Sequence, residues 1–196
     1  MAHIILFHHA QGLTEGLKRY ASALEAAGHS VTMPDMYEGQ TFSTVEAGVA
    51  HAEKITFDAA FARADEALTT ADALPTTESR VYVGFSMGAV PAATHALANP
   101  EARGLILMHA AIDPAWFPAP WPTGLPVQVH ACDADPWMEF DALESLRAAT
   151  AATVPAQVYL YSGESHLFSD DSVPDYNEDY AHAALERVLR FLSDIS

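Results

Sequence analysis

The feature that most constrains the fold of this chain is the alternation of short apolar runs with segments of helical periodicity. About six apolar runs of strand length are separated by segments whose apolar residues recur every three to four positions. Several runs are apolar on both faces, which is typical of strands buried inside a parallel sheet. The alternation therefore predicts an α/β fold with a mostly parallel sheet of about six strands and helices on both faces.

The expected elements can be given as residue ranges. The strands are expected over residues 3–7, 29–35, 80–85, 103–110, 125–132 and 154–161. The helices are expected from about residue 17 to Gly28, over 45–73 with Pro75 as terminator, and over 87–98, 137–151 and 176–192. A chain of 196 residues without a long linker or a repeat is expected to form a single domain, residues 1–196.

The balance of charged residues limits the partners of the protein. Asp and Glu total 26 while Lys and Arg total 9, so the net charge is -17 at pH 7. Such a charge repels nucleic acid and anionic membranes, and it weakly disfavours anionic substrates. We therefore expect a small-molecule substrate, no nucleic acid or membrane as partner, and a monomer or small homo-oligomer.

The sequence also carries hints of location. No apolar run approaches the ~20 residues that a membrane-spanning helix needs. The first residues, MAHIILFHHAQG, lack the basic segment and the cleavage site of a signal peptide. The single cysteine, Cys132, cannot form an internal disulfide, which agrees with a reducing compartment. Together these features predict a cytoplasmic protein.

Residues 84–88 read Gly-Phe-Ser-Met-Gly, a G-x-S-x-G motif between a predicted strand and a predicted helix. This is the context of a nucleophile elbow, a sharp turn that exposes a serine hydroxyl. The turn strains the backbone of the serine, and Gly84 and Gly88 leave room for it. The alternative is a serine that only caps the helix, since so short a pattern also arises by chance. The strand-turn-helix context favours Ser86 as a nucleophile.

A nucleophilic serine needs a base, which follows it along the chain in folds of this kind. His166 lies in a loop directly after the last predicted strand, from where it can reach across the end of the sheet to Ser86. The other downstream histidines fall in predicted helices or at strand positions: His95, His109, His130 and His182. We therefore predict His166 as the base, with a solvated loop histidine as the alternative.

The acid that orients the base should follow the fifth strand, where the sequence reads VHACDADPWM. Asp135 precedes Pro136, which favours an extended backbone and a turn that can direct the carboxylate inward. We favour Asp135 over Asp133, which we expect to be a turn residue bonding its own backbone. Glu164 and Asp170 are further alternatives that we expect to be solvated.

Acyl transfer also needs two N–H donors for the oxyanion. We predict the backbone N–H groups of Met87 and of Ala10, which lies in the loop after the first strand. The adjacent His8 and His9 point to opposite sides of an extended chain, so no metal site is predicted. Cys132 has no elbow around it, and we expect a small buried residue rather than a rival nucleophile.

The sequence resembles the dienelactone hydrolase family of α/β-hydrolases over nearly its whole length. The similar segments are FHHAQGLTEGLKRYASALEAAGHSVTMPDMYEG, VGFSMGA, DADPWM and YSGESHLFSDDSVPDYNEDYAHAALERVLRFL. The resemblance implies a single α/β-hydrolase domain without the first strands of the larger fold, and no cofactor. It also implies Ser86, Asp135 and His166 as the catalytic triad and Met87 and Ala10 as oxyanion donors.

Three positions depart from the family pattern. The founding members have a cysteine nucleophile where this chain has Ser86, and a glutamate in the first loop where this chain has His9. They also have an arginine that binds the substrate carboxylate, near the place of Asp170. This reversal of charge argues against dienelactone, a carboxylate, as the substrate.

The segment AIDPAWFPAPWPTG is a proline-rich aromatic loop between the fourth and fifth predicted strands. Its rings could wall a pocket for an uncharged apolar group, or they could cap the edge of the sheet. We predict a substrate pocket with four members, His9, Tyr37, Trp116 and Trp137.

The sequence as a whole predicts a serine hydrolase that cleaves a small, uncharged ester or lactone through an acyl-enzyme on Ser86, without a cofactor or a metal. One alternative is a non-catalytic binding or scaffold member of the same fold. The other is acyl transfer or C–C bond hydrolysis by the same triad.

Overall fold

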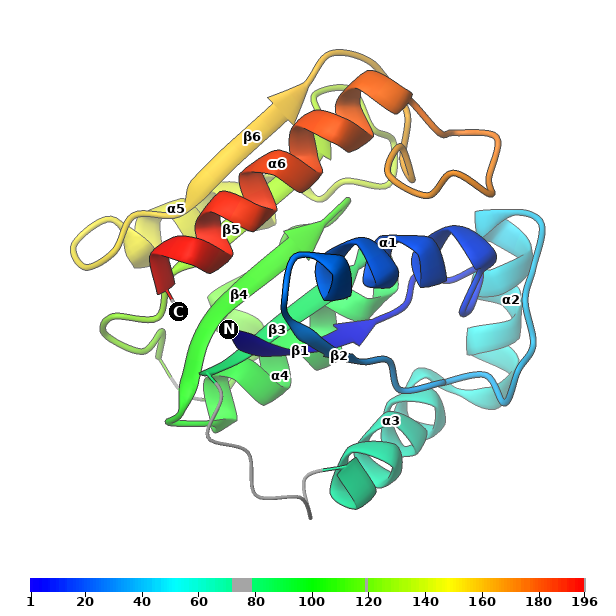
Figure 1. The fold of residues 1–196 in the computed structure, drawn as a ribbon, viewed down its shortest axis with the longest axis horizontal. Coiled ribbons are helices and arrows are strands. Elements are labelled where there is room, and N and C mark those ends of the chain that lie inside the picture. The colour runs from blue at the N-terminus through cyan, green and yellow to red at the C-terminus, as the bar shows by residue number, and fades with distance from the viewer. Residues whose placement is uncertain (72–78, 119, 196) are drawn as a thin grey trace.

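The computed structural model describes residues 1–71, 79–118 and 120–195 of the chain (Figure 1). Its described strands form one six-stranded sheet in the order β2-β1-β3-β4-β5-β6, and every neighbouring pair is parallel. The strands are β1 (Ala2–Phe7), β2 (Ser30–Thr32), β3 (Ser79–Phe85), β4 (Ala102–Met108), β5 (Val127–Cys132) and β6 (Gln157–Tyr161). The predicted parallel sheet is confirmed.

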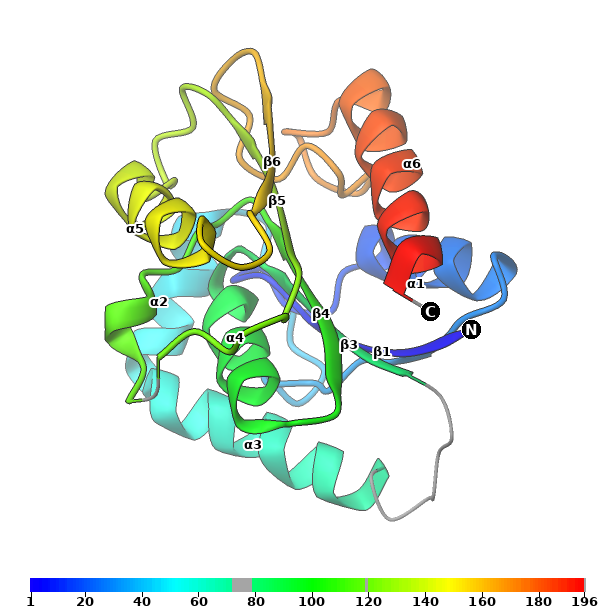
Figure 2. The same ribbon diagram turned by 90° about the vertical axis from the view of Figure 1, so that its left-hand side faces the viewer.

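The described helices cover both faces of this sheet, as predicted. They are α1 (Glu15–Ala26), α2 (Val45–Ile55), α3 (Phe57–Ala71), α4 (Ala89–Ala98), α5 (Phe140–Thr150) and α6 (Glu178–Ile195). Figure 2 shows α1 and α6 on one side of the sheet and α2 to α5 on the other. None of these helices is long and apolar enough to cross a membrane.

One helix and two strands differ most from the sequence prediction. The helix expected over 45–73 is two helices, because Thr56 adopts a φ of 72° and its hydroxyl caps α3 by accepting the N–H of Ala59 at 3.2 Å. The apolar periodicity continues through this break and therefore hides it. The expected end of that helix, at residues 72–75, lies outside the described residues. The second strand is confined to Ser30–Thr32, shorter than the expected 29–35, and the sixth to Gln157–Tyr161, shorter than the expected 154–161.

Two apolar layers form the core, one on each face of the sheet, because side chains alternate along a strand. Ile4 and Leu6 of β1 pack in the layer beneath α1 and α6, whereas Ile5 and Phe7 pack in the layer beneath α2 to α5. All four are buried, and burying such a side chain contributes about 1.5–3 kcal/mol. A strand buried on both faces must be apolar throughout, which explains its continuous apolar run.

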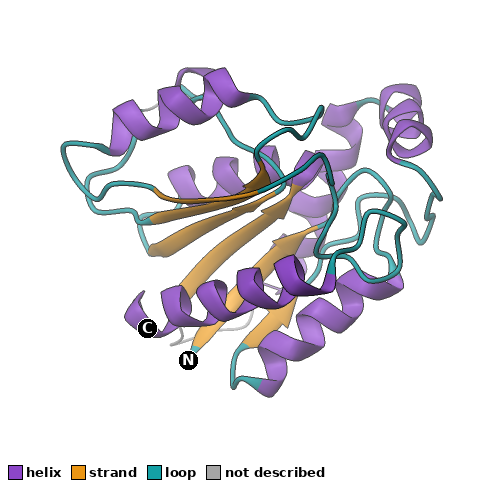
Figure 3. Cartoon of the chain, turned by 90° about the horizontal axis from the view of Figure 1, so that it is seen from above, coloured by secondary structure: helices purple, strands orange, loops and turns teal. Residues whose placement is uncertain are grey.

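The strand order reverses between β1 and β3, and this reversal locates the site. The chain leaves β1 towards β2 on one side and returns to β3 on the other, and Phe7 pairs with Gly84 in register. Figure 3 shows the strands pointing the same way between the two layers of helices. In such sheets, ligands bind beyond the carboxyl ends of the strands at this reversal. The loop after β1 and the turn after β3 therefore emerge side by side.

Candidate active site

The G-x-S-x-G motif forms a sharp turn between β3 and α4. Ser86 opens a short 3-10 turn, η1 (Ser86–Gly88), with a φ of 49°. A side chain on Gly84 would collide with the backbone of Ala89, and a Cβ on Gly88 would lie 2.5 Å from the carbonyl oxygen of Phe7. Both glycines are therefore required by the close approach of backbone segments, and the strained serine is held by its surroundings.

Ser86, His166 and Asp135 form a continuous chain of hydrogen bonds. The Ser86 hydroxyl lies 2.8 Å from Nε2 of His166, and Nδ1 of His166 lies 2.7 Å from Oδ2 of Asp135. The side chains of His166 and Asp135 are 3% and 0% exposed. Because Nδ1–H donates to the carboxylate, Nε2 carries the lone pair that faces the hydroxyl. The other oxygen of Asp135 accepts the N–H of Trp137 at 2.9 Å, which fixes the carboxylate.

The other carboxylates considered from the sequence lie elsewhere. Asp133 is exposed and accepts the N–H of Gly163 at 2.9 Å, so the prediction that it bonds its own backbone was wrong. Glu164 is exposed. Asp170 is only 1% exposed, so the prediction that it is solvated was also wrong.

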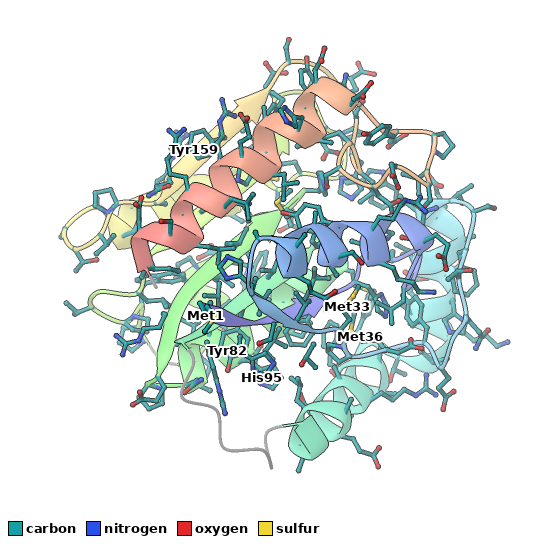
Figure 4. The ribbon with its side chains drawn as sticks, viewed as in Figure 1. Met1, Met33, Met36, Tyr82, His95 and Tyr159 are labelled. Carbon is teal, nitrogen blue, oxygen red and sulfur yellow. The ribbon has the colours of Figure 1, made fainter. Side chains whose placement is uncertain are left out.

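The remaining downstream histidines hold other positions. His95, on α4, stacks on the ring of Tyr82 (Figure 4). It also stacks on the ring of Phe7. His130 is buried in β5, where burial lowers its pKa to about 3, and it lies 2.9 Å from the hydroxyl of Tyr161. His182 is exposed on α6.

The two expected oxyanion donors follow neighbouring strands, Met87 after β3 and Ala10 after β1. Met87 is the second residue of a helical turn, so its N–H has no acceptor within that turn. No acceptor in the described parts of the chain takes the N–H of Ala10. The hydroxyl of Tyr37 donates to Sδ of Met87 at 3.2 Å and supports that side chain.

His8 fixes the start of the loop after β1. Its Nδ1–H donates to the carbonyl of His9 at 2.7 Å, and its Nε2 accepts the N–H of Met36 at 3.0 Å. Because Nε2 accepts a hydrogen bond, the ring must be neutral, and burial lowers the pKa of His8 to about 4.

Nε2 of His9 lies 2.9 Å from Oδ2 of Asp170, which joins two of the three positions that depart from the family pattern. Burial lowers the pKa of His9 against the opposing effect of Asp170. Burial alone would raise the pKa of Asp170, but hydrogen bonds from His9, Ser172 and Thr14 outweigh it and hold that pKa well below its usual range. Asp170 is therefore a carboxylate whose acceptor positions are occupied by protein donors.

A small cavity of about 160 Å³ opens beside Ser86. Its described lining is mainly apolar and aromatic: Ser86, Met87, Ala89, Val90, His109, Ala110, Ala111, Trp116, Trp137 and Glu139. This lining includes Trp116 and Trp137 from the predicted pocket, but not His9 or Tyr37, which are fully buried. No lysine or arginine is among these described residues, and the charged member is Glu139.

His109 is a cavity residue that sequence reasoning passed over. It follows β4, adopts a φ of 60°, and its Nε2 lies 2.6 Å from the hydroxyl of Ser169. Its Nδ1 has no partner among the described residues, and burial lowers its pKa well below the usual value. Its position directly after the central strand β4 was the sequence signal that could have predicted a residue at the site.

The described residues contain no group of three or more His, Cys, Asp or Glu side chains placed to hold a metal ion. Cys132 is fully buried at the end of β5, and burial raises its pKa to about 11. The chemistry that this arrangement can support is therefore that of the hydrogen-bonded serine, histidine and aspartate at the mouth of the cavity.

A model of the dienelactone hydrolase family matches residues 1–196. No curated protein matches the sequence.

Solved structures with a similar fold cover nearly the whole chain. A dienelactone hydrolase-like promiscuous phosphotriesterase from metagenomic libraries is 17% identical, with a TM-score of 0.73 over 100% of this chain and 87% of that chain. The dienelactone hydrolase from Anabaena variabilis is 16% identical, with a TM-score of 0.66 over 99% and 87%. The esterase domain of a Rhodothermus marinus protein is 17% identical, with a TM-score of 0.60 over 97% and 85%. At these identities the likeness shows the α/β-hydrolase fold alone.

Proposed function

Because this chain belongs to the dienelactone hydrolase family, we propose that it is a serine hydrolase that cleaves a small, uncharged ester or lactone. The observation that carries the proposal is the hydrogen-bonded series Asp135–His166–Ser86, in which the serine stands on a strained turn beside a cavity. A serine held in this way is the arrangement that nucleophilic acyl transfer requires.

In the proposed mechanism Ser86 Oγ attacks the carbonyl carbon of the ester while its proton passes to Nε2 of His166. Asp135 keeps Nδ1 protonated and stabilises the imidazolium that forms. The tetrahedral intermediate collapses as His166 protonates the departing alcohol oxygen, which leaves an acyl group on Ser86. Water then attacks the acyl-enzyme, with His166 as its base, and releases the carboxylic acid.

The negative oxygen of each tetrahedral intermediate is bound, in this proposal, by the N–H groups of Met87 and Ala10. These groups follow adjacent strands, and the described residues offer the Ala10 N–H no competing acceptor. The N-terminus of α4 begins three residues after Ser86 and adds the positive end of a helix dipole. Donors fixed before the reaction stabilise the developing charge without reorganisation.

The cavity supports a small, uncharged acyl or alcohol group. Its volume of about 160 Å³ and its walls of alanine, valine and tryptophan suit a short apolar group. A substrate carboxylate would meet Glu139 and would find no cation in the described lining. Asp170 does not replace an arginine that would bind a substrate carboxylate, because it is itself an anion and its oxygens already accept protein donors.

Two measurements with p-nitrophenyl acetate and a fluorophosphonate probe test the proposal. The wild-type protein should hydrolyse the ester and carry the probe on Ser86, as located by mass spectrometry, whereas Ser86→Ala should do neither. An unlabelled wild-type protein would point to a non-catalytic member of the fold. Labelling without ester hydrolysis would point to transfer to another acceptor or to C–C bond cleavage, which product analysis of candidate substrates would identify.

A further inference from the structure

A second buried histidine–carboxylate pair, His9 and Asp170, lies at the same end of the sheet as the triad. Nε2 of His9 is 2.9 Å from Oδ2 of Asp170, and the side chains are 0% and 1% exposed. The two residues are 161 positions apart in the chain. The pair thus connects the loop after β1, which carries Ala10, to the loop after β6, which carries His166.

The neighbours of His9 assign its protons. The backbone N–H of Gln11 donates to Nδ1 at 3.2 Å, so Nδ1 carries the lone pair and Nε2 carries the hydrogen that donates to Asp170. Both ring nitrogens are therefore occupied. His9 has no nitrogen left to act as a second base on a substrate, and its role is confined to what it holds in place.

The carboxylate of Asp170 is itself held by hydrogen bonds from residues other than His9. Oδ2 also accepts the hydroxyl of Thr14, and Oδ1 accepts the N–H and the hydroxyl of Ser172, at 2.9 and 2.6 Å. The backbone of Gly16 packs directly on this carboxylate, where a Cβ would collide with it. The carboxylate therefore fixes the position of Nε2 of His9.

The loop held by this pair is restrained on both sides of Ala10. The carbonyl of His9 accepts the N–H of Gly12 at 3.0 Å, and Gln11 exchanges two hydrogen bonds of 2.9 Å with the backbone of Phe42. The carbonyl of Ala10 packs against Gly48, where again a Cβ would collide. The carbonyl of His9 and the N–H and carbonyl of Gln11 are thus hydrogen-bonded, while the N–H of Ala10 has no acceptor among the described residues.

We infer that His9 and Asp170 are positioning residues that hold the N–H of Ala10 in place for the oxyanion. This inference rests on the proposed function, since it gives the pair a task in the same reaction. The ring of His9 spans Ala10 because its Nδ1 accepts the N–H of Gln11. Asp170 fixes the orientation of that ring by accepting the hydrogen of Nε2. A donor held in this way stabilises the tetrahedral intermediate more than the bound ester, because charge develops on the oxygen only after attack.

The test compares Asp170→Asn with Asp171→Asn, a matched control. Asp171 is the next residue, is exposed, and pairs with Arg19 at the surface, so its replacement makes the same chemical change away from the loop. Active enzyme is first counted by titration with the fluorophosphonate probe, so that loss of folded protein is not read as loss of catalysis. The substrate is p-nitrophenyl acetate, and a small alkyl trifluoromethyl ketone serves as an analogue that forms an oxyanion on Ser86.

Asp170→Asn should lower kcat per titrated site by about tenfold to a hundredfold with KM within about threefold, and the ketone should bind more weakly by a similar factor. The shape of the pH profile should not change, because His166 and Asp135 keep their contacts. If Asp170→Asn folds too poorly to titrate, Ser172→Ala removes one donor to the same carboxylate and should lower kcat by about twofold to fivefold.

Equal kcat and equal ketone affinity in the Asp170 or Ser172 variant and the Asp171 control would overturn the inference and leave the proposed function standing. A wild-type protein that neither turns over the ester nor reacts with the probe would overturn both. A fall in titrated sites with unchanged kcat per site would show that the pair supports folding alone, which also overturns the inference.

Discussion

Nδ1 of His166 donates to Asp135 across 2.7 Å, and both side chains are buried away from solvent. The nearby Asp133 faces solvent and bonds the backbone of Gly163 instead. Asp135 is therefore buried beside the histidine, as the proposed acid of the triad should be, whereas Asp133, two residues earlier, is a solvent-facing residue that holds a turn.

Asp135→Asn should lower kcat for p-nitrophenyl acetate by about 10⁴-fold, because an amide does not hold His166 in the tautomer that accepts the serine proton. Asp133→Asn, the same change at an exposed position, should lower kcat by less than about threefold. Steady-state kinetics on both variants makes the comparison. A larger loss for Asp133→Asn would identify Asp133 as the acid.

Gly88→Ala should disturb the turn that presents Ser86. The added methyl group would lie 2.5 Å from the carbonyl of Phe7 and 2.8 Å from that of His8, both backbone atoms that cannot turn away. We expect a loss of about 1–3 kcal/mol in the free energy of unfolding, measured in urea, and a large loss of ester turnover.

The control is Gly39→Ala, at a position with a φ of 82° and no atom within 4 Å of the added Cβ. It should cost about 1 kcal/mol of stability through backbone strain alone and leave turnover unchanged. Normal turnover in Gly88→Ala would mean that the turn tolerates the side chain and that the steric account of the elbow is wrong.

Trp116→Ala should widen the cavity beside Ser86 and shift the preference for acyl length. The ratio of kcat/KM for p-nitrophenyl butyrate to that for the acetate should rise by about tenfold, within the range that one or two methylene groups contribute in an apolar pocket. Tyr176→Ala, an exposed aromatic residue outside this cavity, should leave the ratio unchanged. An unchanged ratio in Trp116→Ala would place the acyl chain elsewhere.

The stability of the protein should fall as the pH is lowered from about 6.5 towards 4. Burial lowers the pKa of His8 to about 4, of His130 to about 3, and also lowers that of His9 and of His109. In this pH range these histidines bind protons in the unfolded chain but stay neutral in the folded protein, so protonation favours unfolding. The histidines whose folded pKa lies well below the ordinary value are His8, His109 and His130, and each then removes up to about 1.4 kcal/mol per pH unit.

Urea unfolding at pH 7, 6, 5 and 4.5 measures this slope. His130→Gln should reduce the change in unfolding free energy per pH unit by about the contribution of one histidine. His182→Gln, on the exposed side of α6, should leave it unchanged. The low pKa of Asp170 works at more acidic pH, because its contribution is complete above the ordinary carboxyl pKa and is lost only below it. A flat stability between pH 6.5 and 4.5 would contradict neutral buried histidines.

Cys132 should be chemically inert. Burial raises its pKa to about 11 and leaves no exposed surface, so iodoacetamide at pH 8 should neither modify the folded protein nor inhibit it. Cys132→Ala should keep kcat within about twofold of wild type, in contrast to Ser86→Ala. Inactivation by iodoacetamide that Cys132→Ala prevents would make the thiol part of the site.

Much of the fold could be predicted because its signals are local. Continuous apolar runs marked the strands buried on both faces, and the two glycines around Ser86 marked the turn that a close backbone approach requires. The break at Thr56 was missed because a positive φ at a threonine interrupts the helix without interrupting its apolar periodicity. Chain order and strand ends drew attention to His166 and Asp135, which the structure brings into contact.

The sequence by itself determined the order of strands and helices along the chain and the position of the turn at Ser86. It also limited the candidates for the catalytic acid and base to a few residues. Only the tertiary structure decided that Asp170 is buried against His9 and that Tyr37 supports Met87 from outside the cavity. The physical reason is distance along the chain. Periodicity and turn residues act over a few positions, whereas the environment of a carboxylate is set by partners that folding brings from 161 residues away.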